Sequence, residues 1–235
     1  YLPYKKVPFD PLIDFSSLQN QDVLEIGTGN GSHAGLLSWH ARSFVGIDIT
    51  DYAVKSTSLR LKRFELSGQI IQMDAERMAF LSNSFDFIWT WGVIHHSSDT
   101  EQVLSDMHRV LRPGGRAIVM VYHRSFWNWY MVNGLFLGLF RQSRRKVPSV
   151  HSVVQKWTDG AIARYYTIPE WRTLASQFFS VERIAIYGGK PEIVPLPAGR
   201  LKEQALRLIP DRLGRFFTND LKWGVFLVSS LKKEP

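Results

Sequence analysis

Cysteine is absent from the 235 residues of the sequence. Its absence excludes disulfides, zinc sites with cysteine ligands, iron–sulfur clusters and thiol nucleophiles. Apolar runs long enough to cross a bilayer are also missing, because a spanning helix takes about 20 such residues. The longest apolar stretch, residues 126–140, contains Asn128, Asn133 and two glycines. No signal peptide stands at the start, and these absences together favour a cytoplasmic protein.

Acidic residues are the scarcer charge, since 21 Asp and Glu face 29 Lys and Arg and the formal net charge is +8. A basic excess fits nucleic acid, an anionic membrane surface or acidic substrates. The excess lies in the second half of the chain, in two groups: Arg141, Arg144, Arg145 and Lys146, then Arg200, Lys202, Arg207, Arg212 and Arg215. The first 120 residues are nearly balanced, so the excess lies outside the segment that carries the motifs described below.

Apolar segments alternate with helical patterns through the first 122 residues. Strands are expected at residues 22–27, 42–48, 69–73, 84–89 and 117–122. Helices are expected at residues 31–41, 52–66 and 102–111. In the second helix Ala53, Leu59 and Phe64 are available to face inward. Strands alternating with helices at this spacing predict an α/β protein with a mostly parallel, doubly wound sheet and helices on both faces.

The pattern changes after Tyr122. Residues 124–180 are rich in aromatic residues and helical in period, which is typical of a lid or insertion. Residues 181–187 and 223–231 resemble strands that pair antiparallel at the sheet edge, around a basic amphipathic helix at 200–217. The length suits one domain. We therefore expect a single domain over 1–235, with a core at 18–122 and lid or substrate insertions at 124–180 and 190–220.

A glycine-rich turn follows the first expected strand, in the segment Glu25-Ile-Gly27-Thr28-Gly29-Asn-Gly31. Glycines at alternating positions let the backbone turn tightly and let a ligand approach the main chain where a Cβ atom would collide. The dinucleotide fingerprint is G-x-G-x-x-G, and here the third glycine comes one residue early. The acid at the strand end, Glu25, is unfavourable beside a pyrophosphate and favourable beside a cationic amine.

Two acids follow at the ends of the next strands. Asp48 ends the second strand about 20 residues after the glycines, where a carboxylate can accept hydrogen bonds from ribose hydroxyls. Asp74 follows the third strand, near the expected position of an adenine amino group. Residues 84–96 and the turn at 109–115 complete an ordered series. Asp48 as a helix cap and the glycine pair at 114–115 as an ordinary turn remain alternatives for each piece taken alone.

Taken in order, these motifs resemble the class I S-adenosylmethionine-dependent methyltransferases, and most of all their small-molecule group that includes the ubiquinone and menaquinone C-methyltransferases. The resemblance covers residues 18–122 closely. It implies a Rossmann-like sheet of seven strands with an antiparallel edge strand, S-adenosylmethionine as cofactor and S-adenosylhomocysteine as product. It also implies the cofactor contacts: Glu25, Gly27, Thr28, Gly29 and Gly31 for the methionine portion, Asp48 for the ribose, Ile49, Asp74 and Ala75 for the adenine, and Trp91 and Gly92 near the sulfonium.

Trp91 departs from the smaller polar residue common at its position, which predicts a narrowed or aromatic-walled pocket. A general base is needed only if the acceptor must lose a proton, and histidine suits that role near neutral pH. His96 is the first candidate, ahead of His95 and His123. The histidine pair can equally fix its loop by hydrogen bonds. No cluster of His, Asp and Glu has metal-ligand spacing, so no metal is expected.

The segment 126–146 joins an apolar, aromatic stretch to the first basic group. It is consistent with a lid helix over the acceptor, which we favour. The alternative is a peripheral membrane contact, in which the apolar body of the helix lies in the acyl boundary and the cations lie at the head groups. An aromatic-rich acceptor pocket favours a ring-bearing or lipidic small molecule.

The leading hypothesis is thus O- or C-methylation of a small-molecule acceptor in biosynthesis. The alternatives are an RNA methyltransferase and a cofactor-binding regulatory protein without turnover. The string N-P-P-Tyr or D-P-P-Tyr is missing, and the basic residues lie among apolar ones rather than in a stripe, so no nucleic acid is expected as partner.

Overall fold

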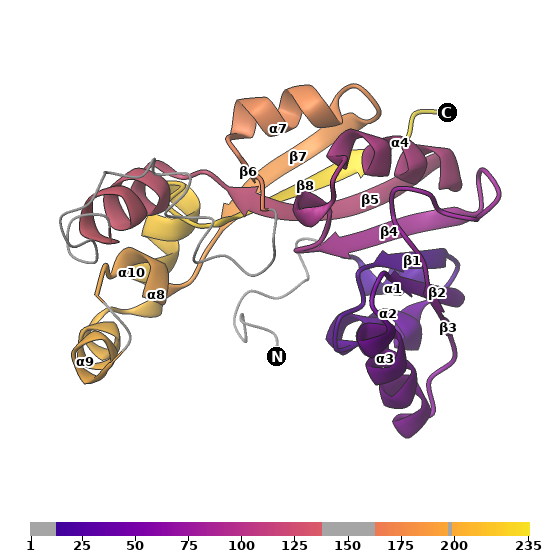
Figure 1. Cartoon of the computed structure of the whole chain (residues 1–235), viewed down its shortest axis with the longest axis horizontal. Coiled ribbons are helices and arrows are strands. Elements are labelled where there is room, and N and C mark those ends of the chain that lie inside the picture. The colour runs from indigo at the N-terminus through magenta and orange to yellow at the C-terminus, as the bar shows by residue number, and fades with distance from the viewer. Residues whose placement is uncertain (1–12, 138–162, 197–198) are drawn as a thin grey trace. The chain divides into compact units, whose positions relative to one another are not determined.

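In the computed structural model, which describes residues 13–137, 163–196 and 199–235, the expected strands assemble into one mixed sheet (Figure 1). The strands follow the order β3-β2-β1-β4-β5-β8-β7, and the two-residue β6 pairs with β5. Their bounds are β1 Asp22–Ile26, β2 Ser43–Asp48, β3 Gln69–Gln72, β4 Phe85–Trp91, β5 Leu111–His123, β6 Tyr165–Tyr166, β7 Ser180–Tyr187 and β8 Phe226–Lys232. The sequence-based prediction of a Rossmann-like α/β fold is confirmed.

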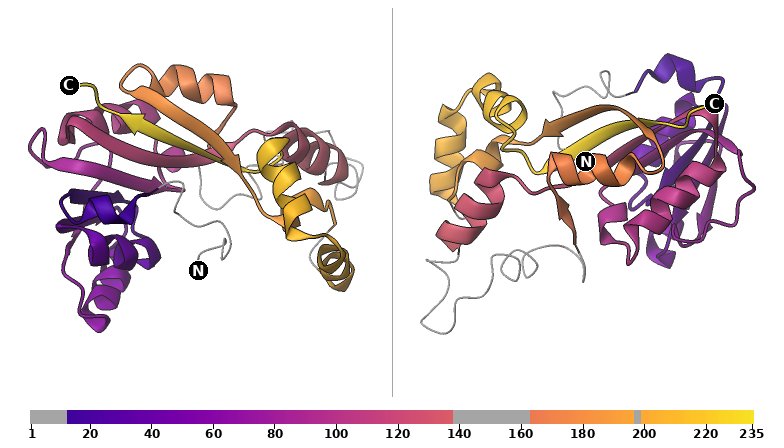
Figure 2. Two further views of the ribbon diagram at one scale, coloured as in Figure 1. Left: turned by 180° about the vertical axis from the view of Figure 1, so that it is seen from behind. Right: turned by 90° about the horizontal axis from the view of Figure 1, so that it is seen from above.

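The helices join these strands. The α-helices are α1 Phe15–Leu18, α2 Ser32–His40, α3 Asp51–Arg63, α4 Thr100–Val110, α7 Ile168–Ala175, α8 Lys190–Ile193, α9 Arg200–Leu208 and α10 Asp211–Arg215. A 3₁₀ turn, η1, covers Ile94–His96, and two π-helical segments cover Phe126–Leu137 (η2) and Phe216–Asp220 (η3). Helices α1 to α3 lie on one side of the sheet, and α4 and α7 on the other (Figures 1 and 2).

The described residues divide into two compact units. The first contains residues 13–120, 171–183 and 229–235, and the second contains residues 121–137, 163–170, 184–196 and 199–228. Strands β5, β7 and β8 each contribute residues to both units. The candidate cofactor residues all belong to the first unit, whereas most of the aromatic segment at 124–180 belongs to the second.

The parallel strands are buried on both faces, as apolar strands covered by helices must be. Val23, Leu24 and Ile26 of β1 are at most 1% exposed, and Ile88 and Trp89 of β4 are equally buried. β8 runs antiparallel to β5, because Lys233 after its end exchanges backbone hydrogen bonds with Gly114 and Gly115 near the start of β5. The expected antiparallel strand therefore lies near the sheet edge, between β5 and β7.

Two sequence-based expectations were wrong in detail. On α3, Ala53 is buried as expected, but Leu59 and Phe64 are 68% and 58% exposed, and Thr57 and Leu61 face the core instead. The expected helix at 200–217 is broken after Leu208 into α9, α10 and η3. Pro210 explains the break, because proline lacks the backbone N–H that a continuous helix needs. Among the described residues no helix has the length and apolar character needed to span a membrane.

Candidate functional site

The candidate site lies at the carboxyl ends of β1, β2 and β4. β1 pairs in parallel with both neighbours, with Ile26 opposite Ile47 on one side and Thr90 on the other. After β1 the chain moves outward through β2 and β3 and then returns to β4 on the opposite side of β1. The loops that follow β1 and β4 therefore diverge, and such a switch point is where open α/β sheets bind ligands.

The glycine turn after β1 has the left-handed backbone that glycine permits. Gly27, Gly29 and Gly31 have φ angles of 80°, 52° and 77°. A Cβ atom on Gly27 would come within 2.1 Å of Val93, so this position needs glycine for close packing. A Cβ atom on Gly29 would meet no atom within 4 Å. The space beside Gly29 is thus open, and a side chain at this position would project into it.

Glu25 is the last but one residue of β1 and is 1% exposed. Its Oε2 atom has no hydrogen-bond partner among the described residues. Burial, and then the charge of Asp48, raise the pKa of Glu25 well above 4.5. A buried carboxylate without a counter-ion is costly, so the position is suited to a ligand that brings a cationic amine.

His33, in the first turn of α2, does not neutralise Glu25. Its Nδ1 atom is 3.8 Å from Glu25 Oε1, but the same atom accepts a hydrogen bond of 3.3 Å from Trp89 Nε1. An accepting Nδ1 carries no proton, and burial lowers the pKa of His33 to about 4. We therefore interpret the contact as one between a carboxyl group and a neutral ring, despite the short distance.

Asp48 joins the glycine turn to the start of α3. Its Oδ2 accepts from the backbone N–H of Gly29 at 3.1 Å, and its Oδ1 accepts from the backbone N–H and hydroxyl of Thr50 at 2.9 and 2.8 Å. Thr50, rather than Asp48, caps the helix. A carboxylate has about four lone-pair sites, so Asp48 keeps capacity for a further donor at the site.

The residues proposed for the adenine lie around the ends of β2 and β3. Ile49 is 66% exposed, which is unusual for isoleucine and leaves an apolar surface beside Asp48. Asp74 is exposed, and its Oδ1 accepts from the backbone N–H of Glu76 at 2.9 Å. Ala75, the residue after Asp74, is half-buried. These three residues follow strands that are neighbours in the sheet, so the structure brings them to the same edge.

Trp91 ends β4 as part of an aromatic cluster. It stacks on Trp89 with ring centroids 5.3 Å apart and an angle of 8°, and both rings have an edge contact with His33. Gly92 follows with a φ of 76° and donates to the carbonyl of Met120. The sequence analysis did not single out His33 as a neighbour of Glu25 and Trp89. Its place two residues after Gly31, in the first helical turn, was the available signal.

The two candidate histidines differ in exposure. His95 is fully buried, and burial, then the neighbouring His96, lower its pKa to about 3. It stays neutral and out of contact with solvent, which is typical of a packing residue. His96 is half-buried, with its ring centroid 4.1 Å from that of His95. His123 belongs to the second unit, where its Nδ1 lies 2.9 Å from the carbonyl oxygen of Gly224.

The aromatic segment of the second unit is partly packed. Trp127 stacks on Trp223 at 4.3 Å and donates to the carbonyl of Glu192, and Trp129 is 7% exposed against Tyr165 at 4.8 Å. Phe126, in contrast, is 70% exposed. Residues 138–162, which include the first basic group and Trp157, lie outside the described residues.

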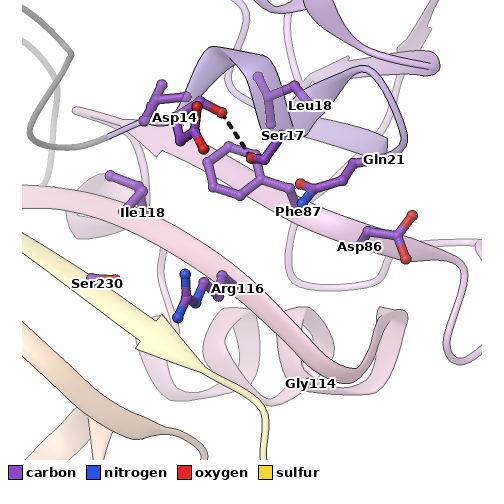
Figure 3. Close-up of a pocket in the computed structure, with 11 residues that line it drawn as sticks. Asp14, Ser17, Leu18, Gln21, Asp86, Phe87, Gly114, Arg116, Ile118 and Ser230 are labelled. Atoms are coloured by element: carbon purple, nitrogen blue, oxygen red, sulfur yellow. Dashed lines mark hydrogen bonds between the residues drawn. The ribbon is translucent and has the colours of Figure 1, made fainter.

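A cavity of about 250 Å³ in the first unit lies away from these residues (Figure 3). It is lined by Ser17, Leu18, Phe87 and Arg116, among others, beside α1 and the first residues of β4 and β5. These are the amino ends of the strands, opposite to the edge that carries the glycine turn. In the described part of the chain, no group of three or more His, Asp or Glu side chains is arranged to hold a metal ion.

Comparison with known proteins identifies the domain that carries this site. The family described as "Methyltransferase domain" matches residues 24–119, from β1 to β5. The chain carries a class I S-adenosylmethionine-dependent methyltransferase domain. A ubiquinone/menaquinone biosynthesis C-methyltransferase of Klebsiella pneumoniae is 29% identical over 160 residues, which cover 65% of this chain and 61% of that protein. The chain thus matches less than two thirds of that relative's length.

A second relative of this methyltransferase domain is a phthiotriol/phenolphthiotriol dimycocerosates methyltransferase of Mycobacterium leprae. It is 32% identical over 102 residues, which cover 42% of this chain and 37% of that protein. Among solved structures, an S-adenosylmethionine-dependent methyltransferase of Mesorhizobium loti aligns with a TM-score of 0.61 and 16% identity over 92% of both chains. At that identity the structural match supports the fold alone.

The cofactor of this domain family is S-adenosylmethionine, and two features of the methyltransferase domain fit it. The buried Oε2 of Glu25 has no partner among the described residues, as an acceptor for an α-amino group requires. The open space at Gly29 lies on the same turn. We conclude that the residues present fit the methionine portion of the cofactor.

Proposed function

We propose that the protein transfers a methyl group from S-adenosylmethionine to an oxygen or carbon atom of a small-molecule acceptor. The buried, uncompensated carboxyl group of Glu25 at the glycine turn is the observation that carries the proposal. A structural role alone does not explain it, since leaving such a group unpaired costs about 1–3 kcal/mol or more.

When bound, S-adenosylmethionine supplies a methyl group on a sulfonium ion. In our proposal Glu25 accepts a hydrogen bond from the α-amino group, the turn with Gly27, Thr28, Gly29 and Gly31 leaves room for the methionine portion, and Asp48 uses its remaining capacity to accept a hydrogen bond from the ribose. Ile49 packs on the adenine, and Asp74 and Ala75 contact its edge. Trp91 and Gly92 lie near the sulfonium, where the face of Trp91 favours positive charge. Holding donor and acceptor aligned in a water-free pocket can supply much of the rate.

His96 is the candidate general base for acceptors that must lose a proton. It is half-buried, and an exposed ring nitrogen is needed to take a proton from an acceptor. The full burial of His95 supports a positioning role for it, in which its ring fixes η1 beside His96. Carbon acceptors that are already nucleophilic would not need His96 at all.

We infer that the acceptor is aromatic or lipidic. One relative is named for ubiquinone and menaquinone biosynthesis and the other for phthiotriol and phenolphthiotriol dimycocerosates. The second unit of this chain holds Trp127, Trp129 and Trp223 in contact with other aromatic rings. In this proposal, residues 124–180 and 190–220 contribute the acceptor pocket and 18–122 the cofactor core of a single domain over 1–235. We expect biosynthetic function and a cytoplasmic location.

The segment 126–146 stays a lid or a peripheral membrane contact. The packing of Trp127 and Trp129 supports the lid. Substitution of Arg144 and Arg145 by Glu tests the choice. A membrane segment predicts weaker binding to anionic vesicles at low salt, since each cation near such a surface contributes about 1 kcal/mol. A lid instead predicts that the protein does not bind anionic vesicles at any salt concentration. It also predicts that the acceptor protects the fluorescence of Trp127 or Trp129 from quenchers.

The function is tested by transfer of labelled methyl groups to pools of quinones, phenols, sterols, other lipids, sugars and RNA. We expect label in an aromatic or lipid pool. Label in RNA alone would identify an RNA methyltransferase. Binding of S-adenosylhomocysteine without transfer to any pool would favour the regulatory alternative.

A further inference from the structure

Helix α9 has its apolar side in solvent. None of its nine residues is buried, and Leu201 and Leu208 are 75% and 84% exposed. These two leucines and Ala205 are spaced i, i+4 and i+7, so they form one stripe along the helix. Amphipathic helices of globular proteins normally turn such a stripe toward the core. We therefore expect a binding partner to cover the two exposed leucines of this helix.

The helix is held in this orientation by its neighbour α8. Lys190 Nζ donates to the carbonyl oxygens of Ile209 at 2.6 Å and Leu206 at 3.5 Å, at the end of α9. The same ammonium group pairs with Asp211 at 2.5 Å. Lys202 of α9 is partly buried beside Glu192 of α8. Lys202 and Leu206 are half-buried, so their side of α9 faces the rest of the second unit, and the leucine stripe lies on another side.

Cations border the leucine stripe. Arg200 and Arg207 are exposed and lie seven residues apart, so they share one side of α9, next to Leu201 and Leu208. Among the described residues neither arginine forms an ion pair within 4 Å. The following elements α10 and η3 repeat this combination, with Leu213 and Phe216 44% and 47% exposed beside Arg212 and Arg215. The acids of this region are fewer: Glu203, Asp211 and Asp220, and Asp211 is already paired.

We propose that α9 docks the protein on an anionic lipid surface, with Leu201 and Leu208 in the head-group boundary and Arg200 and Arg207 at lipid phosphates. An interfacial helix combines these two elements, an apolar side at the acyl boundary and cations level with the head groups. Arginine suits the border position because its apolar stem lies along the leucines while its guanidinium stays in water. This docking surface is distinct from residues 126–146 and does not depend on which acceptor is methylated.

A second copy of the chain fits the stripe less well. A two-fold symmetric contact brings a surface against itself, so Arg200 and Arg207 would meet the same arginines of the other copy. Protein interfaces are depleted of charge at their centre. An anionic lipid surface instead supplies the opposite charge along the whole border of the stripe.

The test is co-sedimentation of the full chain with vesicles of phosphatidylcholine alone or mixed with phosphatidylglycerol, at low and high salt. We expect binding to the anionic vesicles, weakened by salt because screening acts over about 10 Å at 0.1 M. Leu201→Ser combined with Leu208→Ser should lower the partition coefficient at least tenfold, the scale expected for exposing buried leucine side chains. Arg200→Glu combined with Arg207→Glu should weaken binding most at low salt.

Matched controls come from the first unit. Leu81 is 84% exposed, as Leu208 is, and Leu81→Ser should leave vesicle binding unchanged. Lys62→Glu combined with Arg63→Glu on α3 reverses two exposed cations elsewhere. S-adenosylhomocysteine affinity, measured for every variant, reports folding and the cofactor site independently of lipid.

Three results would overturn the proposal. The first is a wild-type chain that does not sediment with anionic vesicles at low salt. The second is a loss in Leu81→Ser as large as that in the α9 leucine variant. The third is a concentration-dependent dimer that the α9 leucine variant dissociates, which would assign the stripe to a protein interface.

Discussion

At the scale of single residues, the protonation of Glu25 is the property most open to measurement. Because its pKa is raised well above 4.5, a fraction of the protein carries a proton on Glu25 that a cationic amine must displace. S-adenosylhomocysteine affinity should therefore rise as the pH increases through the raised pKa of Glu25. Glu25→Gln should lose about 1.5–3 kcal/mol of binding free energy and the pH dependence with it.

Calorimetry in two buffers of different ionisation enthalpy measures this release of protons. His33→Gln is a suitable control, because it changes the ring beside Glu25 and leaves the carboxyl group in place. Equal affinity and an equal pH profile for Glu25→Gln and the wild type would refute the role of Glu25.

A larger side chain should abolish ligand binding at Gly29 and lower the stability of the protein at Gly27. Gly29→Val meets no atom within 4 Å of its Cβ, so it should fold, with strain of about 1–2 kcal/mol from the left-handed backbone. It should nevertheless lose S-adenosylhomocysteine binding, because its side chain enters the ligand space. Gly27→Ala collides with Val93 and should lower the free energy of unfolding itself. Thermal unfolding and calorimetry separate the two effects, and undiminished binding by Gly29→Val would move the site elsewhere.

The two adjacent histidines also make distinct predictions. For an acceptor that must lose a proton, His96→Ala should lower kcat about 10²–10⁴-fold while cofactor affinity is kept. His95→Ala removes a buried ring and should lower the free energy of unfolding, by about 2–4 kcal/mol on the scale of other buried truncations. Steady-state kinetics and urea unfolding on both variants provide the comparison. A His96 variant with wild-type kcat on its own acceptor would remove the base from the mechanism.

At the scale of elements, Glu192 ties the start of α8 to the start of β8. Its Oε1 accepts from the backbone N–H of Gly189 at 2.8 Å and its Oε2 from that of Val225 at 3.0 Å. Burial raises the pKa of Glu192 to about 7, against the hydrogen bonds from Gly189 and Val225, which lower it. A carboxyl group with a raised folded pKa stabilises most when protonated, so its contribution is complete below about pH 4.5 and is lost as the pH rises through 7.

The second unit should accordingly become less stable between pH 4.5 and 7, by an amount on the order of 3 kcal/mol. Glu192→Gln should flatten this dependence. It should also cost some stability at low pH, because the amide nitrogen replaces one of the two carboxyl oxygens and cannot accept a backbone hydrogen bond. Hydrogen exchange of the amides of Gly189 and Val225 as a function of pH measures the effect. A pH-independent exchange rate in the wild type, after correction for intrinsic exchange, would contradict it.

At the scale of the whole molecule, the ion pairs at the amino ends of β1 and β4 should make the first unit less stable in acid, which is the opposite of the pH dependence expected for the second unit. Asp22 accepts from both Arg42 and Arg112 at 2.6 and 2.9 Å, and Asp86 accepts from Arg112 at 2.6 Å, across the starts of the central strands. The hydrogen bond from Arg42 lowers the pKa of Asp22 below its ordinary 3.8. The stabilisation is complete above pH 3.8 and is lost as the pH falls through the lowered value.

The first unit should therefore begin to unfold at acid pH, whereas the second unit should become less stable as the pH approaches neutral. Asp22→Asn should cost about 1–3 kcal/mol at pH 7 and shift the acid transition upward. Hydrogen exchange of the amides of β1 and β4 across pH follows the first unit, and that of the amides of Gly189 and Val225 follows the second. Coincident transitions at every pH would show that the two units unfold as one.

Several features of the protein were already predictable from the order of residues along the chain. Glycines at 27, 29 and 31 after an apolar strand favour a left-handed turn, and acids at 25, 48 and 74 lie at or just after the carboxyl ends of three parallel strands, which share one edge. These are local requirements of backbone conformation and strand alternation, so the fold, the domain family and its cofactor could be predicted before the structure. The roles of the individual site residues remain proposals.

Tertiary structure decided what depends on neighbours distant in sequence. The burial of Glu25 and the rise in its pKa come from its surroundings, including Asp48. The neutral state of His33 comes from its burial, and its Nδ1 accepts a hydrogen bond from Trp89, 56 residues away. Packing also decided which side of a helix faces inward: Leu61 rather than Leu59 on α3, and the leucine stripe of α9 outward. Periodicity specifies that a helix has two unlike sides, but only the elements packed around it determine which side is covered.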